Sequence, residues 1–251
     1  MKSIEFAAED FLNFHPEFYQ TLVSHNETKN HILVVLGSER GFCGNYNELL
    51  CQATAEYIKK STEKGLNLNV IAVGYKIHNK FDLLPEVKQT LFGPRLTEDI
   101  PTVIAELTES IDTLCQVNQL DERRGLQLTV LYHREQNARP EFRQILPAFQ
   151  TITPKNSLYT TKPQTYLSNI DLYVSLLDEY LFASLNQLFY AAFMAENLHR
   201  VRHMENALNK LSKKITGLSV KRNEVRQEEI TEELEVIMLS SSAIEETAEE
   251  S

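Results

Sequence analysis

"VRHMENALNKLSKKITGL", residues 201–218, is the stretch that decides the architecture of this chain. Its apolar side chains recur at alternating intervals of three and four residues, at Val201, Met204, Leu208, Leu211, Ile215 and Leu218. That spacing places them along one face of an α-helix, which is the pattern of a coiled-coil seam. The stretch therefore predicts a helix whose apolar stripe packs against a partner.

The predicted helix extends well beyond this seam. Residues 164–251 contain no proline and one glycine, Gly217, and Ser168 with Asp171 forms a capping pair just before an apolar run. A helix from that pair to about residue 246 would be roughly 110 Å long at about 1.5 Å per residue. A globular domain of about 120 residues has a radius of gyration of only about 14 Å, so most of the helix must project. Each buried seam side chain contributes about 1.5 to 3 kcal/mol, so the seam needs a partner.

The N-terminal segment "KSIEFAAEDFLNF", residues 2–14, is the other candidate helix for this seam. Its apolar residues are helically spaced before Pro16 interrupts, at Ile4, Phe6, Ala7, Phe11 and Phe14. The segment is too short to cover the whole seam, and no capping residue precedes it. Two explanations stay open: a second polypeptide supplies the partner helix, or the chain is a shortened form.

Between about residues 31 and 153 short apolar runs alternate with helical patterns. The clearest runs are "HILVVLG" at 31–37, "LNVIAVG" at 68–74 and "LQLTVLY" at 126–132, and the helical patterns fall at 47–64 and near 99–118. This alternation predicts an α/β, Rossmann-like domain with a mainly parallel sheet. We therefore divide the chain into an N-terminal helix remnant (1–24), an α/β central domain (28–165) and a long C-terminal coiled-coil helix (166–251).

Composition and charge exclude several functions. The 251 residues carry a formal net charge of -10, which disfavours binding to the phosphate backbone of nucleic acids. No run of about 18 apolar residues and no signal pattern is present, so we expect a soluble, unexported protein without direct lipid insertion. The cysteines Cys43, Cys51 and Cys115 lack C-x-x-C spacing, which argues against a disulfide framework or a zinc site.

"GSERGFCGNYNELL", residues 37–50, follows an apolar run and raises the question of a phosphate cradle. Its glycines, Gly37, Gly41 and Gly44, fit neither the G-x-G-x-x-G pattern nor a P-loop, which needs Lys followed by Ser or Thr. We interpret the segment as a tight structural turn formed by Arg40, Gly41, Cys43 and Gly44. The alternative is a nucleotide- or anion-binding α/β enzyme with a helical oligomerisation arm.

Two histidines, His199 and His203, stand four residues apart on the predicted helix, a spacing that lets two rings share a metal. No third ligand lies nearby in the sequence, and there is no H-E-x-x-H pattern. Both histidines lie off the seam, so we expect them to face water. The sequence therefore predicts no catalytic residue, no cofactor and no metal.

Two segments resemble the gamma subunit of F-type rotary ATP synthases and ATPases. The family's acidic-Arg-Gly-x-Cys-Gly-x-x-Asn pattern is met by Glu39, Arg40, Gly41, Cys43, Gly44 and Asn47. Its Arg-x-x-x-Met, Asn-x-x-Arg-Gln and Ile-Thr-x-Glu-Leu patterns are met by Arg200, Met204, Asn223, Arg226, Gln227, Ile230, Thr231, Glu233 and Leu234. The chain departs from the family in three ways. It lacks most of the N-terminal helix, it ends in "SSSAIEETAEES", and the residue sequence of its turn, "GSERGFCGNYN", is not the commonest one. These departures point to a divergent branch, with the alternative sodium-linked F-type ATPases as the candidate.

The resemblance implies a central rotor shaft that couples ion-driven rotation of a membrane ring to ATP synthesis or hydrolysis and performs no chemistry itself. The implied partners are the alpha and beta subunits of the catalytic hexamer, the epsilon subunit and the membrane c-ring. The implied location is the cytoplasmic face of the bacterial inner membrane. The implied subunit contacts are Met204, Arg222, Asn223, Arg226, Gln227, Thr231 and Glu233.

The charge along the predicted helix adds an electrostatic feature. Residues 199–226 hold the basic residues Arg200, Arg202, Lys210, Lys213, Lys214, Lys221, Arg222 and Arg226 against Glu205 and Glu224. A basic shaft would be attracted to the acidic levers that the family's beta subunits present, with a strength that salt reduces. Without the resemblance, a solvated helix face explains the same charges.

Overall fold

The computed structural model describes residues 2–15, 18, 30–81, 84–117, 126–135, 139–149 and 165–249, with side chains as far as residue 239. Packing divides the chain into two units, Met1–Val201 and Arg202–Ser251. The predicted domain boundary between residues 24 and 28 lies outside the described residues, and the boundary at 165–166 lies at their edge. These boundaries stay a prediction.

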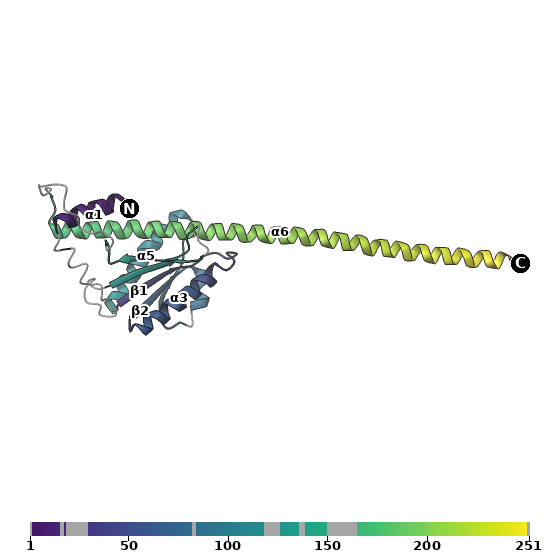
Figure 1. The fold of residues 1–251 in the computed structure, drawn as a ribbon, viewed down its shortest axis with the longest axis horizontal. Helices are drawn as coiled ribbons and strands as arrows, with labels where there is room; N and C mark the ends of the chain where they lie inside the picture. Colours follow the sequence, from purple (N-terminus) through teal and green to yellow (C-terminus); the bar gives the residue numbers. More distant parts are fainter. Residues whose placement is uncertain are drawn as a thin grey trace. The chain divides into compact units, whose positions relative to one another are not determined.

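The first unit is built on a five-stranded sheet in the order β3-β2-β1-β4-β5 (Figure 1). The strands are β1 (Asn30–Leu36), β2 (Asn67–Val73), β3 (Val87–Leu91), β4 (Leu126–Tyr132) and β5 (Glu141–Leu146). The pairs β1–β2, β1–β4 and β2–β3 are parallel, and β5 runs antiparallel to β4. The predicted α/β fold with a mainly parallel sheet is therefore confirmed.

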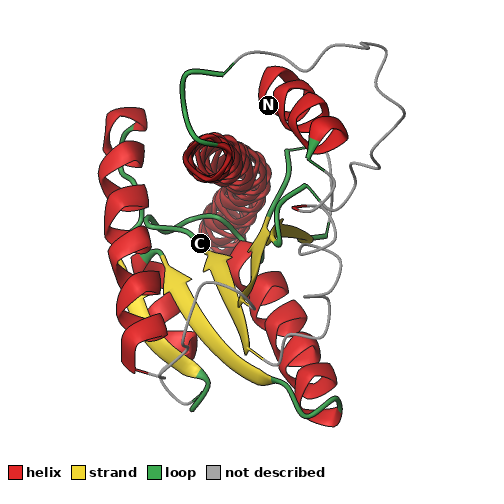
Figure 2. Cartoon of the chain, turned by 90° about the vertical axis from the view of Figure 1, so that its left-hand side faces the viewer, coloured by secondary structure: helices red, strands yellow, loops and turns green. Residues whose placement is uncertain are grey.

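Helices cover both faces of this sheet, as Figure 2 shows. They are α1 (Lys2–Phe14), α3 (Tyr46–Glu63), α4 (Tyr75–Phe81), α5 (Ile100–Val117) and α6 (Asn169–Glu249), with a short 3-10 turn at Thr97–Asp99. Because side chains alternate along a strand, β1 sends Ile32 and Val34 to one core and Leu33 and Val35 to the other. A strand buried on both faces reads as a continuous apolar run, which is why "HILVVL" is recognisable in the sequence.

The two cores differ in the helices that close them. One joins the sheet to α1, α5 and the part of α6 between Tyr180 and Ala192. The other joins it to α3 and α4, with Leu50 and Ile77 fully buried. The first part of α6 is therefore a core helix of the α/β unit.

The long helix begins where its capping pair predicts. The hydroxyl of Ser168 accepts a hydrogen bond from the backbone N–H of Asp171 at 3.2 Å and donates to the Asp171 carboxylate at 2.6 Å. The bonds satisfy polar groups of the first turn, which otherwise has no intrahelical acceptor for its N–H groups. The helix then continues without a break for 81 residues.

The N-terminal helix α1 packs on the beginning of α6. Phe11 lies 5.8 Å from Tyr173, ring centroid to ring centroid, at an interplanar angle of 20°. Ala8, Phe11 and Leu12 are buried. This contact belongs to the first unit and leaves the seam from Val201 onward uncovered by α1.

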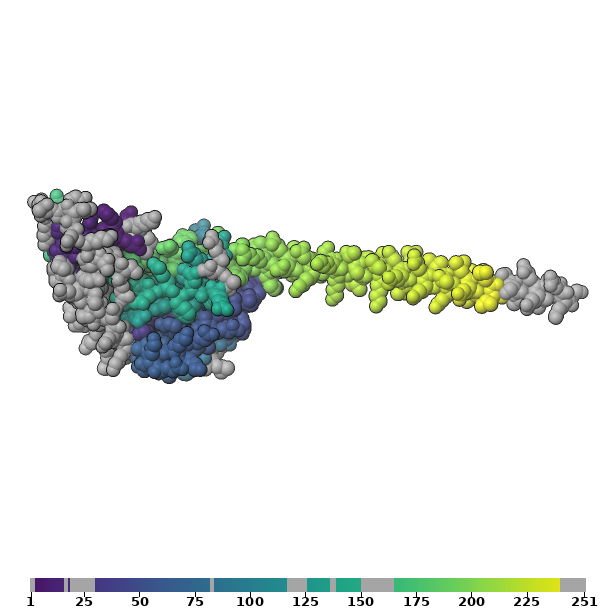
Figure 3. Space-filling model, in the orientation of Figure 1, coloured from purple at the N-terminus to yellow at the C-terminus, as the bar shows by residue number. Residues whose placement is uncertain are grey.

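The second unit is the remainder of α6. Every described residue from Val201 to Leu239 is exposed, including all the seam residues predicted above (Figure 3). Leu208, for example, keeps 66% of its surface accessible and Leu218 keeps 60%. A long helix with a bare apolar stripe is incomplete without a partner, because apolar surface in water carries a free-energy cost.

Two glycines outside the long helix provide a test of the packing at the strand ends. Gly74 closes β2 with a φ of +111°, and a Cβ there would lie 2.7 Å from the carbonyl oxygen of Gly37. Gly65 has a φ of +66°, but a Cβ there would meet no non-neighbouring atom within 4 Å. We expect Gly74→Ala to lower the free energy of unfolding by about 3 kcal/mol or more, and Gly65→Ala by about 1 kcal/mol. Urea denaturation measures both losses, and equal losses would contradict the close approach at Gly74.

Candidate functional site

The glycine-rich turn lies between β1 and α3, at the carboxyl end of the parallel strands, where α/β proteins commonly bind ligands. Gly37 donates a hydrogen bond to Val73 at 2.8 Å, and a Cβ at Gly37 would lie 2.7 Å from the Ile77 side chain. Phe42 and Gly44 both have positive φ, 65° and 61°. The turn is therefore tightly packed at its start and left-handed at its tip, as expected for a structural turn.

Three backbone N–H groups at the start of this turn, those of Ser38, Glu39 and Arg40, donate to side chains of the same protein. The Ser38 N–H donates to the Asn47 side-chain oxygen at 3.0 Å. The Glu39 and Arg40 N–H groups donate to the two carboxylate oxygens of Glu196, at 3.4 and 3.2 Å. The turn does hold an anion, but the anion is a carboxylate from α6 and not a phosphate. These three N–H groups are therefore not free to bind a phosphate.

Glu39 ties the turn to the neighbouring strand ends. Its side chain is buried and accepts hydrogen bonds from the Tyr75 N–H at 3.0 Å and the Gly93 N–H at 2.8 Å. Arg95 donates to its other oxygen at 3.3 Å. One carboxylate thus links the loops that follow β1, β2 and β3.

Arg200 completes the contact between α6 and the turn. Its Nε donates to the Gly41 carbonyl oxygen at 3.2 Å, and one of its terminal nitrogens donates to the Asn197 side chain at 2.6 Å. Its other terminal nitrogen forms an ion pair with Glu196, one helical turn earlier. Burial raises the pKa of the Glu196 carboxyl, while the N–H of Arg40, the charge of Arg200 and the N–H of Glu39 act in the opposite direction.

Cys43 is part of this turn and is buried. Its sulfur lies 3.5 Å from the carbonyl oxygens of Arg40 and Gly41, to which the thiol donates. Burial raises the pKa of the Cys43 thiol, and the carboxylate of Glu196 raises it further. A thiol that stays protonated at neutral pH is a poor nucleophile, which argues against a catalytic role for Cys43.

The interpretation that His199 faces water is wrong. Its ring lies 5.4 Å from that of Tyr46 and 5.3 Å from that of His133, in the packing between α6, α3 and the end of β4. The seam register that suggested an exposed ring applies only from Val201 onward, whereas α6 before that residue packs on the sheet with a different face. His203 is exposed, as predicted.

His133 is the buried partner in that cluster. Its Nε2 donates to the Tyr46 carbonyl oxygen at 3.0 Å, and its Nδ1 is buried with no hydrogen-bond partner in the described part of the chain. Burial lowers the pKa of His133 to about 4, against the opposing effect of the Tyr46 hydrogen bond, and His199 lowers it further. The ring therefore packs in its neutral form at physiological pH.

The residues predicted to contact other subunits all lie in the second unit, on α6. They are Met204, Arg222, Asn223, Arg226, Gln227, Thr231 and Glu233, and all are exposed. Thr231 bonds back to the Gln227 carbonyl oxygen at 2.9 Å, a contact within the helix. The structure thus places these residues on one exposed helix, and the turn residues Arg40, Gly41, Cys43 and Gly44 in the other unit.

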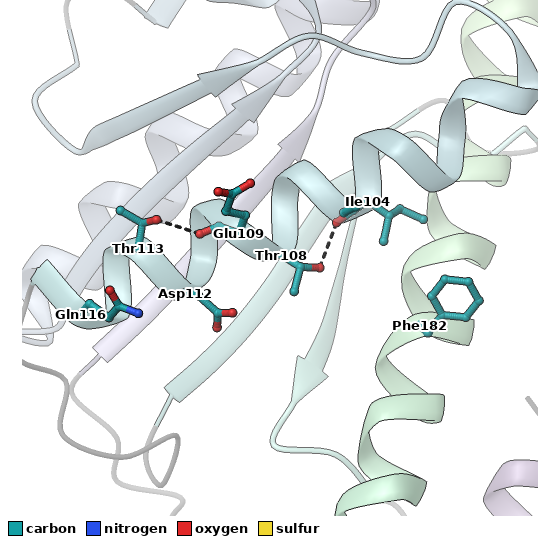
Figure 4. A pocket seen from close by; sticks show the side chains of 8 residues that line it. Ile104, Thr108, Glu109, Asp112, Thr113, Gln116 and Phe182 are labelled. Carbon is teal, nitrogen blue, oxygen red and sulfur yellow. Dashed lines mark hydrogen bonds between the residues drawn. The ribbon is translucent and has the colours of Figure 1, made fainter.

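An open groove lies between α5 and α6 (Figure 4). Its walls include Asp112, Gln116 and, from α6, Phe182. The hydroxyls of Thr108 and Thr113 bond to carbonyl oxygens of their own helix, at 2.9 Å in each case. These polar groups do not converge on one point, so the groove has no arrangement for catalysis.

Metal and membrane sites also fail to appear among the described residues. That part of the chain brings together no group of three or more His, Cys, Asp or Glu side chains that could hold a metal ion. Within the same residues, no helix has the length and apolar character that a bilayer crossing requires. The fold thus defines a class of protein, an α/β domain followed by a long C-terminal helix with an exposed apolar stripe.

Comparison with known proteins identifies the family. The sequence profile of the ATP synthase family matches residues 2–244. The chain is 24% identical to the ATP synthase gamma chain of Syntrophus aciditrophicus over 97% of its own length and 83% of the relative's. It is 26% identical to that of Rickettsia prowazekii, over 97% and 80% of the two chains. The chain therefore belongs to the gamma chain family of F-type ATP synthases, the non-catalytic rotor subunits.

Solved structures share its fold. The rotor of the Euglena gracilis mitochondrial ATP synthase superposes with a TM-score of 0.55 at 14% identity, over 84% of this chain and 78% of that one. The central stalk of the Tetrahymena thermophila enzyme gives 0.54 at 16% identity, over 82% and 98%. The α/β sheet with a long terminal helix is thus a recurrent architecture.

The buried His133 ring generates a prediction for the pH dependence of stability. A histidine whose pKa falls from 6.5 to about 4 on folding binds more protons in the unfolded state between those values. Stability should therefore decrease as the pH drops through this window, with this residue contributing at most about 1.4 kcal/mol per pH unit. Urea midpoints measured from pH 7 to pH 4 test this.

Two variants separate the effect of His133 on stability from that of Glu196, whose raised pKa makes stability change with pH in the opposite direction. His133→Asn should flatten the pH dependence relative to the unaltered chain, and His203→Asn, at an exposed position, should leave it unchanged. Identical slopes in the unaltered chain and in His133→Asn would contradict the assignment.

Proposed function

We propose that this chain is the central rotor shaft of an F-type ATP synthase, with the exposed part of α6 enclosed by a ring of alternating alpha and beta subunits. The observation that carries the proposal is the apolar seam from Val201 to Leu218, exposed along its whole length. An enclosing wall of other subunits supplies the cover that the seam needs. Covering its six side chains amounts to about 10 kcal/mol of hydrophobic stabilisation.

Charge supports the same arrangement. Residues 199–226, which include the seam, carry the eight basic residues described above, in a chain whose overall charge is -10. A positive segment of a rod fits acidic levers on a surrounding ring, and the attraction falls as salt screens it. Because the rod is asymmetric, its turning presents different contacts to each beta subunit and so shifts each one between states of different nucleotide affinity.

The remaining partners follow from this role. The α/β domain docks on the epsilon subunit and the membrane c-ring, and the assembly lies on the cytoplasmic face of a bacterial inner membrane. In this division of labour residues 1–24 and 166–251 form the shaft and residues 28–165 the docking domain. The candidate contacts to the ring are Met204, Arg222, Asn223, Arg226, Gln227, Thr231 and Glu233, with Arg226 and Gln227 foremost.

Affinity purification of the tagged chain from its source cell tests the proposal. We expect alpha and beta subunits to co-elute in fixed stoichiometry together with ATPase activity. Their absence from the eluate would overturn the rotor assignment. Saturation binding of ATP to the isolated chain should detect no specific site, since the donors of the glycine-rich turn are bound by Glu196 and Asn47.

A charge substitution on α6 tests the proposed ring contacts. Arg226→Ala should lower the ATP hydrolysis rate of the purified complex by about tenfold, the effect of losing one charged hydrogen bond of roughly 1.5 kcal/mol. Lys210→Ala removes the same charge from the same helix at a position outside the proposed contacts, and should reduce the rate by less than about twofold. Equal effects of the two substitutions would show that net charge, and not the contact at Arg226, matters.

A further inference from the structure

The contact between Glu196 and the glycine-rich turn lies just before the stretch of α6 in which every described residue is exposed. Ala192, Ala195 and Glu196 are buried, and Arg200 is half-buried. From Val201 to Leu239 every described residue is exposed. Glu196 and Arg200 therefore make the polar contacts of α6 with the sheet that lie nearest to the exposed stretch.

The contacts at this place are directional. Apolar packing opposes separation of α6 from the sheet and large turns of the helix about its axis, because either would expose its buried face, but it is less sensitive to small rotations since the hydrophobic effect has no preferred direction. Hydrogen bonds to a carboxylate or a guanidinium weaken steeply when donor and acceptor lose alignment. Three such bonds join α6 to the turn, two through Glu196 and one from Arg200 to Gly41.

The turn itself is held by a second carboxylate. Glu39 accepts hydrogen bonds from the loops after β2 and β3, through the N–H groups of Tyr75 and Gly93. The next residue, Arg40, donates its N–H to Glu196. A continuous chain of hydrogen bonds thus runs from the ends of three parallel strands to α6.

We propose that Glu196 and Arg200 form a torque clamp, a pair of positioning residues that fixes the rotational register of α6 on the sheet. When the α/β domain is turned, the clamp makes the exposed part of α6 turn with it. This rests on the proposed function as a rotor. The glycine-rich turn, whose backbone N–H groups can bind an anion, here binds the Glu196 carboxylate of the same chain.

Glu196→Gln is the direct test, because it preserves the size of the side chain. The amide has one acceptor oxygen and one NH2 group, so at least one backbone N–H of the turn loses its acceptor. In the purified complex, reconstituted into vesicles, we measure ATP hydrolysis and ATP-driven uptake of protons or sodium ions. We expect hydrolysis to stay within about twofold, and the number of ions moved per ATP to fall at least about threefold.

The ratio of pumping to hydrolysis separates a clamp from a merely structural role. A structural role would lower the thermal midpoint or the yield of complex, but each assembled complex would still move as many ions per ATP as before. An unchanged ratio in Glu196→Gln would therefore overturn the clamp. Glu205→Gln, an exposed glutamate nine residues further along α6, is the matched control and should change neither quantity.

A second variant keeps the test decisive if Glu196→Gln does not assemble. Arg200→Gln leaves Glu196 in the turn and removes the bond to the Gly41 carbonyl oxygen. A lowered ratio supports the clamp, and a normal ratio overturns it. Failure of the unaltered chain to co-purify with alpha and beta subunits would overturn the rotor assignment itself, which is a different result from normal pumping by the variants.

Discussion

The Glu196 carboxylate accepts hydrogen bonds from the backbone N–H groups of Glu39 and Arg40, and this interaction joins the long helix α6 to the turn at the end of β1. A buried charge is stable only when its hydrogen bonds are satisfied, so α6 must hold this residue against the turn. The same turn has a left-handed backbone at Phe42 and Gly44, shortly after the two residues whose N–H groups bind Glu196. Sheet, turn and helix thereby depend on one another.

This interaction also explains why a glycine-rich turn at a strand end occurs in a non-catalytic protein. Backbone N–H groups that point to one side form an anion site whatever the anion is. In nucleotide-binding folds the anion is a phosphate from outside, and here it is a side chain 156 residues along the sequence from Arg40. The same local geometry that serves ligand binding elsewhere serves attachment of a helix in this chain.

The architecture could be predicted from the sequence, because strongly periodic helices and fully buried strands have recognisable residue patterns. β1 and β2 are continuous apolar runs, and Ser168 with Asp171 marks the start of α6 within a residue. The sequence patterns did not predict α4 and β3, which are short, and β3 alternates between half-buried and exposed residues. Glu196 escaped because a glutamate on a charged helix resembles solvent-facing ones until the fold places it, and His199 was misplaced for the same reason.

The bare stripe on α6 has a consequence for the life of the polypeptide in the cell. A newly synthesised chain exposes apolar side chains along tens of residues before it binds its partner subunits, and such exposure favours aggregation with other copies. The acidic balance of the whole chain, -10, supplies mutual repulsion and delays such encounters. Synthesis of this subunit should therefore be matched to synthesis of the proteins that enclose it, since excess chains would keep their apolar stripe exposed and aggregate.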